Sequence, residues 1–165
     1  MTWLTARYED VVSRLEQNHH FPWIMSVGCC SHEIQNSSLA TYDWQRLGVD
    51  DVSTDPTQSN LLILGGWINT ERAQEIKYVY DQMRKPTAVI AIGACAISGS
   101  PYKALIDAPS VHGEVIKAED IVPVDIYVAG CPPRPESILS SILELQKKLK
   151  PGPSHREVLS EALRN

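Results

Sequence analysis

Four cysteines are the residues of this chain whose type and spacing could do chemistry. Cys29 and Cys30 are adjacent, Cys95 lies between two alanines, and Cys131 stands between a glycine and two prolines. Each follows a strand-like apolar stretch, so strand ends could deliver four thiolates to one edge of a sheet. A site with four cysteine ligands suits a [4Fe–4S] cluster or a structural zinc ion.

Three other states of these cysteines compete with an iron–sulfur cluster. Disulfides are disfavoured because the first residues run into a polar helix pattern without a secretory signal, which indicates a reducing compartment. Structural zinc sites usually pair their ligands as C-x2–4-C, a spacing that this sequence lacks. Buried inert cysteines are disfavoured because a glycine lies within two residues of each cysteine, and glycine lets backbone approach a bulky cofactor. Iron–sulfur ligation therefore fits the residues best.

The composition is that of a globular protein with one domain. The chain has 165 residues, of which 43% are hydrophobic and 21% are charged. A net charge of −5 argues against nucleic-acid binding. The longest apolar run, residues 87–97, is too short to span a bilayer. We expect a single α/β iron–sulfur domain over residues 1–150, followed by a polar tail over residues 151–165.

Apolar periodicity predicts strands that alternate with helices. Residues 98–119 read as a loop-rich excursion, and residues 31–47 as helical turns with Ser31 as a possible N-cap and Gly48 as a stop. The last helix should bury Leu143 and Leu149 together with three other apolar residues, Ile138, Leu139 and Ile142. The expected strands cover residues 23–27, 60–66, 88–92 and 122–128, and the expected helices cover residues 2–18, 70–85 and 134–150.

This order of elements implies a flavodoxin-like α/β fold, with a mainly parallel sheet flanked by helices. Ligands of such sheets bind beyond the carboxyl ends of the strands, which is where the cysteines lie. The predicted fold and the predicted site therefore agree. A nucleotide-binding α/β protein is a weaker reading, because neither G-x-G-x-x-G nor a P-loop follows any expected strand.

Several motifs occur in an order that makes a family recognisable. They are Gly-Cys-Cys-x-x-Glu at residues 28–33, Ile-Gly-Ala-Cys-Ala at residues 92–96, Val-Pro-Val-Asp-Ile-Tyr-Val at residues 122–128 and Gly-Cys-Pro-Pro-Arg-Pro-Glu at residues 130–136. Over residues 22–150 the chain resembles the small iron–sulfur (B) subunit of the complex I family, the NADH–quinone oxidoreductases. That family is similar in turn to the small subunits of membrane-bound [NiFe] hydrogenases.

The resemblance implies a cofactor and a role. Cys29, Cys30, Cys95 and Cys131 would ligate one [4Fe–4S] cluster, the last of the electron chain, which passes electrons to quinone at the boundary with a large subunit. A ferredoxin-like iron–sulfur subunit and a membrane-embedded subunit would be further partners, and the chain would be held peripherally at the cytoplasmic face of the membrane. Glu33 falls where the family carries an acidic residue. It could couple proton movement to cluster reduction, or it could be a surface carboxylate.

The sequence also departs from the respiratory pattern around the tandem cysteines. It has Ser-His-Glu-Ile-Gln at residues 31–35 where Ala-x-Glu-Met-Met is usual, and Thr-Tyr-Asp at residues 41–43 where Arg-Tyr-Asp is usual. The segment between Cys95 and Cys131 is also longer. These departures favour an archaeal or anaerobic relative, such as a sulfur-reducing or an energy-converting hydrogenase-related membrane complex. An alternative of another class is a flavodoxin-like protein with structural zinc.

The sequence also supports expectations for several other side chains. Arg46 and Arg134 could stabilise cluster charge or pair with a partner's carboxylates, or they could be ordinary surface arginines. Histidines at four positions lack ligand spacing and are expected at the surface: His19, His20, His112 and His155. An apolar surface for a partner subunit is expected from four further residues: Trp23, Met25, Ile34 and Trp67.

Overall fold

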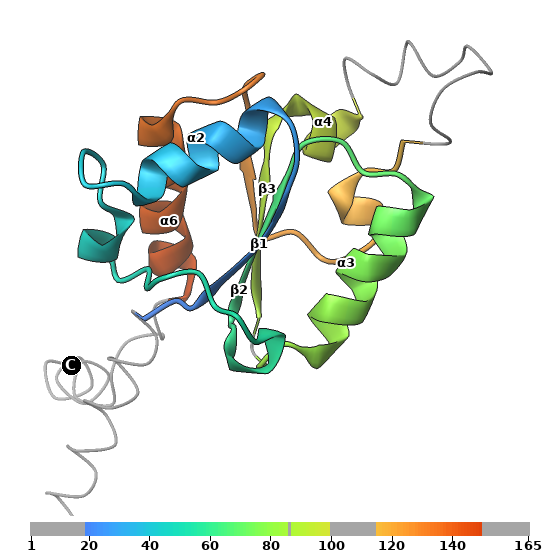
Figure 1. The fold of residues 1–165 in the computed structure, drawn as a ribbon, viewed down its shortest axis with the longest axis horizontal. Coiled ribbons are helices and arrows are strands. Elements are labelled where there is room, and N and C mark those ends of the chain that lie inside the picture. Colours follow the sequence, from blue (N-terminus) through green and yellow to red (C-terminus); the bar gives the residue numbers. More distant parts are fainter. Residues whose placement is uncertain (1–18, 86, 100–114, 150–165) are drawn as a thin grey trace, which may run out of the picture.

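The computed structural model describes residues 19–85, 87–99 and 115–149 (Figure 1). The helix expected over residues 2–18, the tail over residues 151–165 and most of the excursion over residues 98–119 lie outside the described residues. The division of the chain into one domain and a tail therefore stays a prediction.

The described residues contain one four-stranded sheet in which every pairing is parallel. Its order follows the chain, with β1 and β4 at the edges and β2 and β3 in the centre. The α/β fold with a parallel sheet is confirmed. The strands are β1 (Pro22–Ser26), β2 (Leu61–Gly65), β3 (Ala88–Ile92) and β4 (Ile126–Val128).

Helices cover both faces of this sheet. On one face lie α2 (Cys29–Ser38) and α6 (Pro135–Leu149), and on the other lies α3 (Thr70–Gln82) (Figure 1). A short helix, α4 (Gly93–Ser98), directly follows β3. Three 3-10 helices complete the described elements: η1 (Trp44–Leu47), η2 (Pro56–Gln58) and η3 (Ala118–Asp120).

The two central strands are buried on both faces, as their continuous apolar runs predict. Successive side chains of a strand point to opposite faces. Leu61 and Ile63 accordingly join the core beneath α2 and α6, whereas Leu62 and Leu64 join the core beneath α3. The sheet therefore separates two hydrophobic cores.

The strand expected over residues 122–128 is shorter than predicted and begins at Ile126. Pro123 has no N–H to donate to a ladder, which disfavours pairing there. Instead, the Asp125 carboxylate accepts a hydrogen bond from the Val89 N–H at 2.8 Å, and the Asp125 N–H donates to the Val89 carbonyl at 2.9 Å. The Asp125 side chain thus takes part in the pairing between β3 and the residue that directly precedes β4.

The buried face of α6 also differs from the prediction. Leu143 is 43% exposed and Leu149 is also exposed, so both assignments to the core were wrong. Ile138 and Leu145 are buried seven residues apart, as two helical turns require. Ser141 is tolerated on this face because its hydroxyl donates to the Ile138 carbonyl at 2.6 Å.

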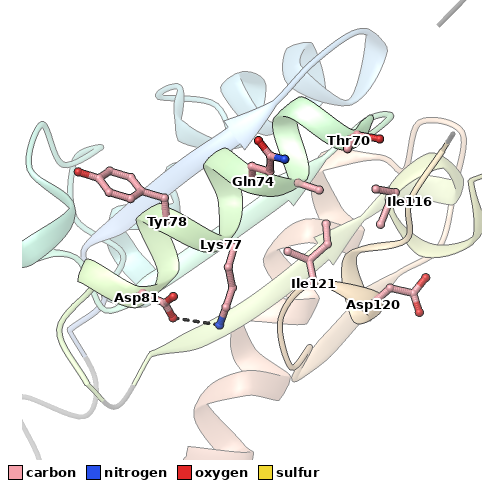
Figure 2. A pocket seen from close by; sticks show the side chains of 9 residues that line it. Thr70, Gln74, Lys77, Tyr78, Asp81, Ile116, Asp120 and Ile121 are labelled. Carbon is pink, nitrogen blue, oxygen red and sulfur yellow. Dashed lines mark hydrogen bonds and ion pairs between the residues drawn. The ribbon is translucent and has the colours of Figure 1, made fainter. Parts of the chain in front are cut away.

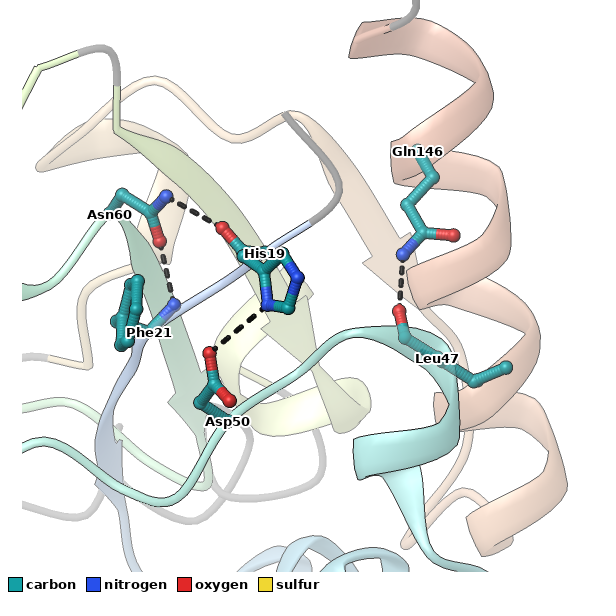
Figure 3. A network of polar contacts seen from close by, with 6 residues as sticks. All are labelled: His19, Phe21, Leu47, Asp50, Asn60 and Gln146. Carbon is teal, nitrogen blue, oxygen red and sulfur yellow. Dashed lines mark hydrogen bonds and ion pairs between the residues drawn. The ribbon is translucent and has the colours of Figure 1, made fainter. Parts of the chain in front are cut away.

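Polar contacts close the sheet at the amino ends of its strands (Figure 3). The Asn60 side chain accepts from the Phe21 N–H at 2.7 Å and donates to the His19 carbonyl at 3.1 Å. The Gln146 amide of α6 donates to the Leu47 carbonyl. The Asn60 bonds hold the start of β1 at the end of the sheet opposite to the cysteines, and the Gln146 bond joins α6 to η1.

His20 is buried, with 2% of its surface exposed, so its expected surface position was wrong. Its N–H donates to the Gly48 carbonyl and its carbonyl accepts from the Asp50 N–H, both at 2.8 Å. Among the described residues, the Nε2 atom of its buried side chain has no hydrogen-bond partner. Burial, followed by the charge of His19, lowers the pKa of His20.

Candidate functional site

Three of the four cysteines occupy the same place relative to a strand. The last residues of the four strands lie on one line of register, in the order Ser26, Gly65, Ile92 and Val128. Cys29, Cys95 and Cys131 each stand three positions after the end of β1, β3 and β4, respectively. Because the carboxyl ends of parallel strands meet at one edge, these residues converge there.

The tandem cysteines form the first turn of α2. The helix begins at Cys29 and not near Ser31, so the expected N-cap was wrong. Gly28 adopts a positive φ of 66°, which lets the chain turn directly from β1 into the helix. Successive helix residues point roughly 100° apart. Cys29 is therefore exposed, whereas Cys30 turns inward and is only 1% exposed.

Cys95 lies in α4, a helix that the sequence pattern did not indicate. Gly93 begins this helix with a φ of 87°, and Cys95 is 4% exposed. The Ala94 N–H donates to the Gly130 carbonyl at 2.8 Å. This bond joins the segment of Cys95 to the segment of Cys131, whose side chain is exposed.

The thiols influence one another electrostatically. The pKa of Cys30 is raised to about 11, mainly by burial; the Gly66 N–H lowers it, and the neighbouring Cys29 and Cys95 contribute smaller increases. Burial also raises the pKa of Cys95, with added contributions from Cys131 and Cys29. Two buried thiols and two exposed thiols thus form one group at the edge of the sheet.

The donor set fits a multi-iron cluster more readily than a single ion. Within the part of the chain that the structure describes, no three His, Cys, Asp or Glu side chains are close enough to hold one metal ion. A structural zinc ion needs its four sulfurs around a single centre. In a cubane each thiolate binds a different iron, so the sulfurs stand farther apart. The close approach of Gly93 to the Cys30 sulfur also leaves no room for a side chain behind this ligand.

A polar cluster that the sequence pattern did not reveal lies beside the cysteines. The Tyr42 hydroxyl donates to Glu136 Oε1 of α6 at 3.3 Å. The charge of Glu136 is the main cause that raises the pKa of Tyr42, Glu33 raises it less, and Arg134 lowers it. Glu33 is half-buried on α2, and its carbonyl accepts from the Ser37 hydroxyl at 2.8 Å. Only the folded chain brings these residues together, so no local signal marks them.

The remaining candidates are placed as follows. Arg46 is exposed and bonds Asp43 at 2.7 Å, as an ordinary surface arginine does. Arg134 is exposed near Cys131. Ile34 is fully buried in the core beneath α2, so its expected surface position was wrong. It lies one turn after Cys30 and shares its inward direction. The three other apolar candidates are half-buried: Trp23, Met25 and Trp67.

A groove of about 590 Å³ lies elsewhere, between α3 and the segment that carries η3 (Figure 2). None of the cysteines lines it. Its rim includes the ion pair between Lys77 and Asp81, at 3.0 Å. The candidate site is therefore an exposed edge of the sheet and not this groove. Among the described helices, none combines the length and the apolar character that crossing a membrane requires.

Comparisons with known proteins add three observations. A family model for the NADH ubiquinone oxidoreductase 20 Kd subunit matches residues 3–145. The (B) subunit of the NADH-quinone oxidoreductase of Phocaeicola vulgatus is 38% identical over 148 residues, which cover 89% of this chain and 71% of that protein. A chain from the membrane-bound sulfane sulfur reductase, an archaeal respiratory membrane complex, aligns with a TM-score of 0.69 and 28% identity over 86% of this chain and 76% of its own length.

A more distant likeness concerns the fold alone. A chain of the NAD+-reducing [NiFe]-hydrogenase in its H2-reduced state aligns with a TM-score of 0.61 and 18% identity. The alignment covers 84% of this chain and 97% of that chain. The α/β fold of this chain thus also occurs in a chain of a hydrogenase.

Proposed function

The chain belongs to the family of the NADH ubiquinone oxidoreductase 20 Kd subunit and is thus a subunit of an oxidoreductase complex, and from this premise we propose that it relays electrons through one [4Fe–4S] cluster. Cys29, Cys30, Cys95 and Cys131 would hold the cluster, which supplies one-electron transfer when bound. The observation that carries this proposal is the common register line, from which three parallel strands deliver their cysteines to one edge.

The chain's own residues define the two sides of the site. Cys30 and Cys95 are buried against the sheet edge, and Cys29 and Cys131 are exposed at its rim. Electron exchange with another subunit is fastest where the ligands are least covered, so the rim is the side that a partner would approach. The half-buried Glu33 lies beside this rim and is our candidate for taking up a proton when negative charge arrives.

The proposed partners follow from the family. A large catalytic-type subunit would cover the rim, with quinone bound at the boundary. A ferredoxin-like iron–sulfur subunit would donate electrons, and a membrane-embedded subunit would hold the assembly at the cytoplasmic face. In this arrangement the chain would be peripheral, held by its partner subunits.

A second candidate acceptor is a sulfur compound or protons in place of quinone. The likeness to a chain of the sulfane sulfur reductase, at 28% identity, supports it. The departures at Ser31, Ile34 and Gln35 from the respiratory pattern point the same way. The large subunit decides between the candidates: two Cys-x-x-Cys pairs there would indicate a NiFe centre, and a His and a Tyr placed for a headgroup would indicate quinone.

Metal analysis of anaerobically prepared protein tests the cluster. We expect four irons and four sulfides per chain and an EPR signal on reduction. Replacing any one of the four cysteines by serine should remove or convert that cluster, because a cubane needs four ligands. The variant His32→Ala is the matched control, since His32 is exposed two positions after Cys30 and is assigned no ligand role. One zinc per chain without sulfide would refute the proposal.

A further inference from the structure

The Cys30 sulfur is enclosed by backbone from the ends of two other strands. A Cβ atom added to Gly93, just after β3, would lie 2.5 Å from Cys30 Sγ. A Cβ added to Gly65, the last residue of β2, would lie 3.4 Å from Cys30 Cβ. Real Cβ atoms essentially never approach another atom as closely as 2.5 Å. The position of this sulfur therefore depends on the absence of a side chain at residue 93.

The backbone also donates to this sulfur. The Gly66 N–H, at the residue directly after β2, forms a hydrogen bond with Cys30. Gly66 has a φ of 80°, and a Cβ there would lie 2.2 Å from the Val27 carbonyl oxygen. That carbonyl belongs to the segment that leads from β1 to the tandem cysteines. Gly66 thus both donates to Cys30 and allows the chain before Cys30 to pass close by.

Cys30 differs in this respect from its neighbour in the sequence. Cys29 is exposed, so water can solvate charge on its sulfur. Cys30 is buried, with 1% of its surface exposed, so water cannot solvate charge on its sulfur. Charge on a buried thiolate needs a fixed donor to replace water. The Gly66 N–H is a donor of this kind.

We propose that Gly66 and Gly93 form a backbone cradle that positions the Cys30 sulfur and sets the reduction potential of the bound cluster. The inference rests on the proposed function, because it needs a cluster at these cysteines. Hydrogen bonds to ligand sulfurs stabilise the more negative, reduced form and so raise the potential. Gly93 acts through packing and Gly66 through its N–H, and both are positioning residues.

The variant Gly93→Ala tests the packing part of the cradle. Its new Cβ must displace the Cys30 sulfur and lengthen the bond from Gly66, so the midpoint potential should fall and the g-values should shift. Loss of iron to a chelator should be about tenfold faster. Gly48→Ala is the matched control, because Gly48 has a φ of 77° but ends η1, where no cysteine is near. It carries the same backbone strain and should keep the wild-type potential.

A measurement on the wild-type protein keeps the proposal testable if Gly93→Ala fails to fold. Protein that carries 15N at the Gly66 amide alone, made by joining a synthetic segment, should show a 15N hyperfine coupling in pulsed EPR of the reduced cluster. Protein labelled in the same way at Gly48 should show none. A folded Gly93→Ala variant with four irons and unchanged potential, or wild type without the glycine coupling, would overturn the cradle. A wild-type chain that binds no cluster would instead overturn the proposed function.

Discussion

Two carboxylates beside the cysteines differ in their surroundings. Glu136 accepts the Tyr42 hydroxyl, whereas Glu33 is half-buried and its side chain has no such donor among the described residues. Of the two, Glu33 is the carboxylate that we propose takes up a proton when the neighbouring site gains an electron.

Replacement of Glu33 by glutamine tests this role. Glu33→Gln should keep the cluster and complex assembly, slow turnover, and flatten the dependence of the midpoint potential on pH, because no carboxylate remains to take up a proton. Potentiometry from pH 6 to 9 would measure it, with Glu75→Gln, on the exposed side of α3, as control. Identical potentials at every pH, with unaltered turnover, would make Glu33 a surface carboxylate.

The amino end of β1 carries a histidine whose burial should make folding depend on pH. Because its folded pKa is lowered, the unfolded chain binds a proton on His20 before the folded chain does. Stability is then complete above about pH 6.5, the ordinary value, and is lost as the pH falls toward the lowered value. Urea titrations of His20→Phe between pH 5 and 8 should show a smaller loss than wild type.

The control for this prediction is a histidine without such burial. His32 is exposed on α2, so His32→Gln should leave the pH profile of wild type unchanged. Within the described part of the chain, His20 Nε2 has no hydrogen-bond partner, and the nearby Asp50 is paired with His19 at 3.5 Å. A profile equal in His20→Phe and wild type would assign the acid sensitivity to other groups.

Two leucines of α6 allow a matched test of the core. Leu145 is fully buried and Leu143 is 43% exposed, although both are leucines of the same helix. Leu145→Ala should lower the free energy of unfolding by about 2–5 kcal/mol, because it leaves a cavity. Leu143→Ala should cost less than about 1 kcal/mol. Denaturant unfolding measures both. Equal losses would place the buried face of α6 where the sequence pattern first suggested it.

Other elements show what the sequence could and could not predict. The strand over residues 88–92 was predicted with its observed bounds because its apolar run is short and rich in β-branched Val and Ile. Helix α4 was missed because its six residues are too few to show a period. The short β4 was overextended because its first residues are apolar, although Pro123 prevents pairing.

The candidate site was predictable in its residue types and not in its surroundings. The cysteines stand out by motif, and the ends of strands place them at one edge. The Gly66 donor and the bond from Tyr42 to Glu136 join segments far apart in the chain, and the latter spans 94 positions. Such contacts depend on closure of the whole fold, for which no local pattern exists.

The edge of the sheet that carries the cysteines is partly exposed in this chain, which is a subunit of a larger complex. Cys29 and Cys131 are exposed, whereas Cys30 and Cys95 are buried with raised pKa values. Iodoacetamide should therefore alkylate the first pair well before the second in cluster-free isolated chain, since the thiolate is the reactive form. Mass spectrometry of timed samples measures the order.

Assembly with the large subunit should change this order. If the partner covers the rim, Cys29 and Cys131 should become as slow as the buried pair once the complex has formed. The isolated chain with its cluster should also lose iron in air, because its rim is open to oxygen. Four equal alkylation rates in the free chain, or an air-stable monomer with full iron content, would contradict this view of the rim.

The common register line carries a consequence for biogenesis. Cys29 and Cys131 meet only after β1, β2, β3 and β4 have paired in order, and a slip of one residue would move a cysteine by about 3.3 Å and turn its strand over. A nascent or misfolded chain therefore offers no complete acceptor for iron and sulfide. Insertion of the proposed cluster would therefore be possible only in chains whose sheet has already formed completely.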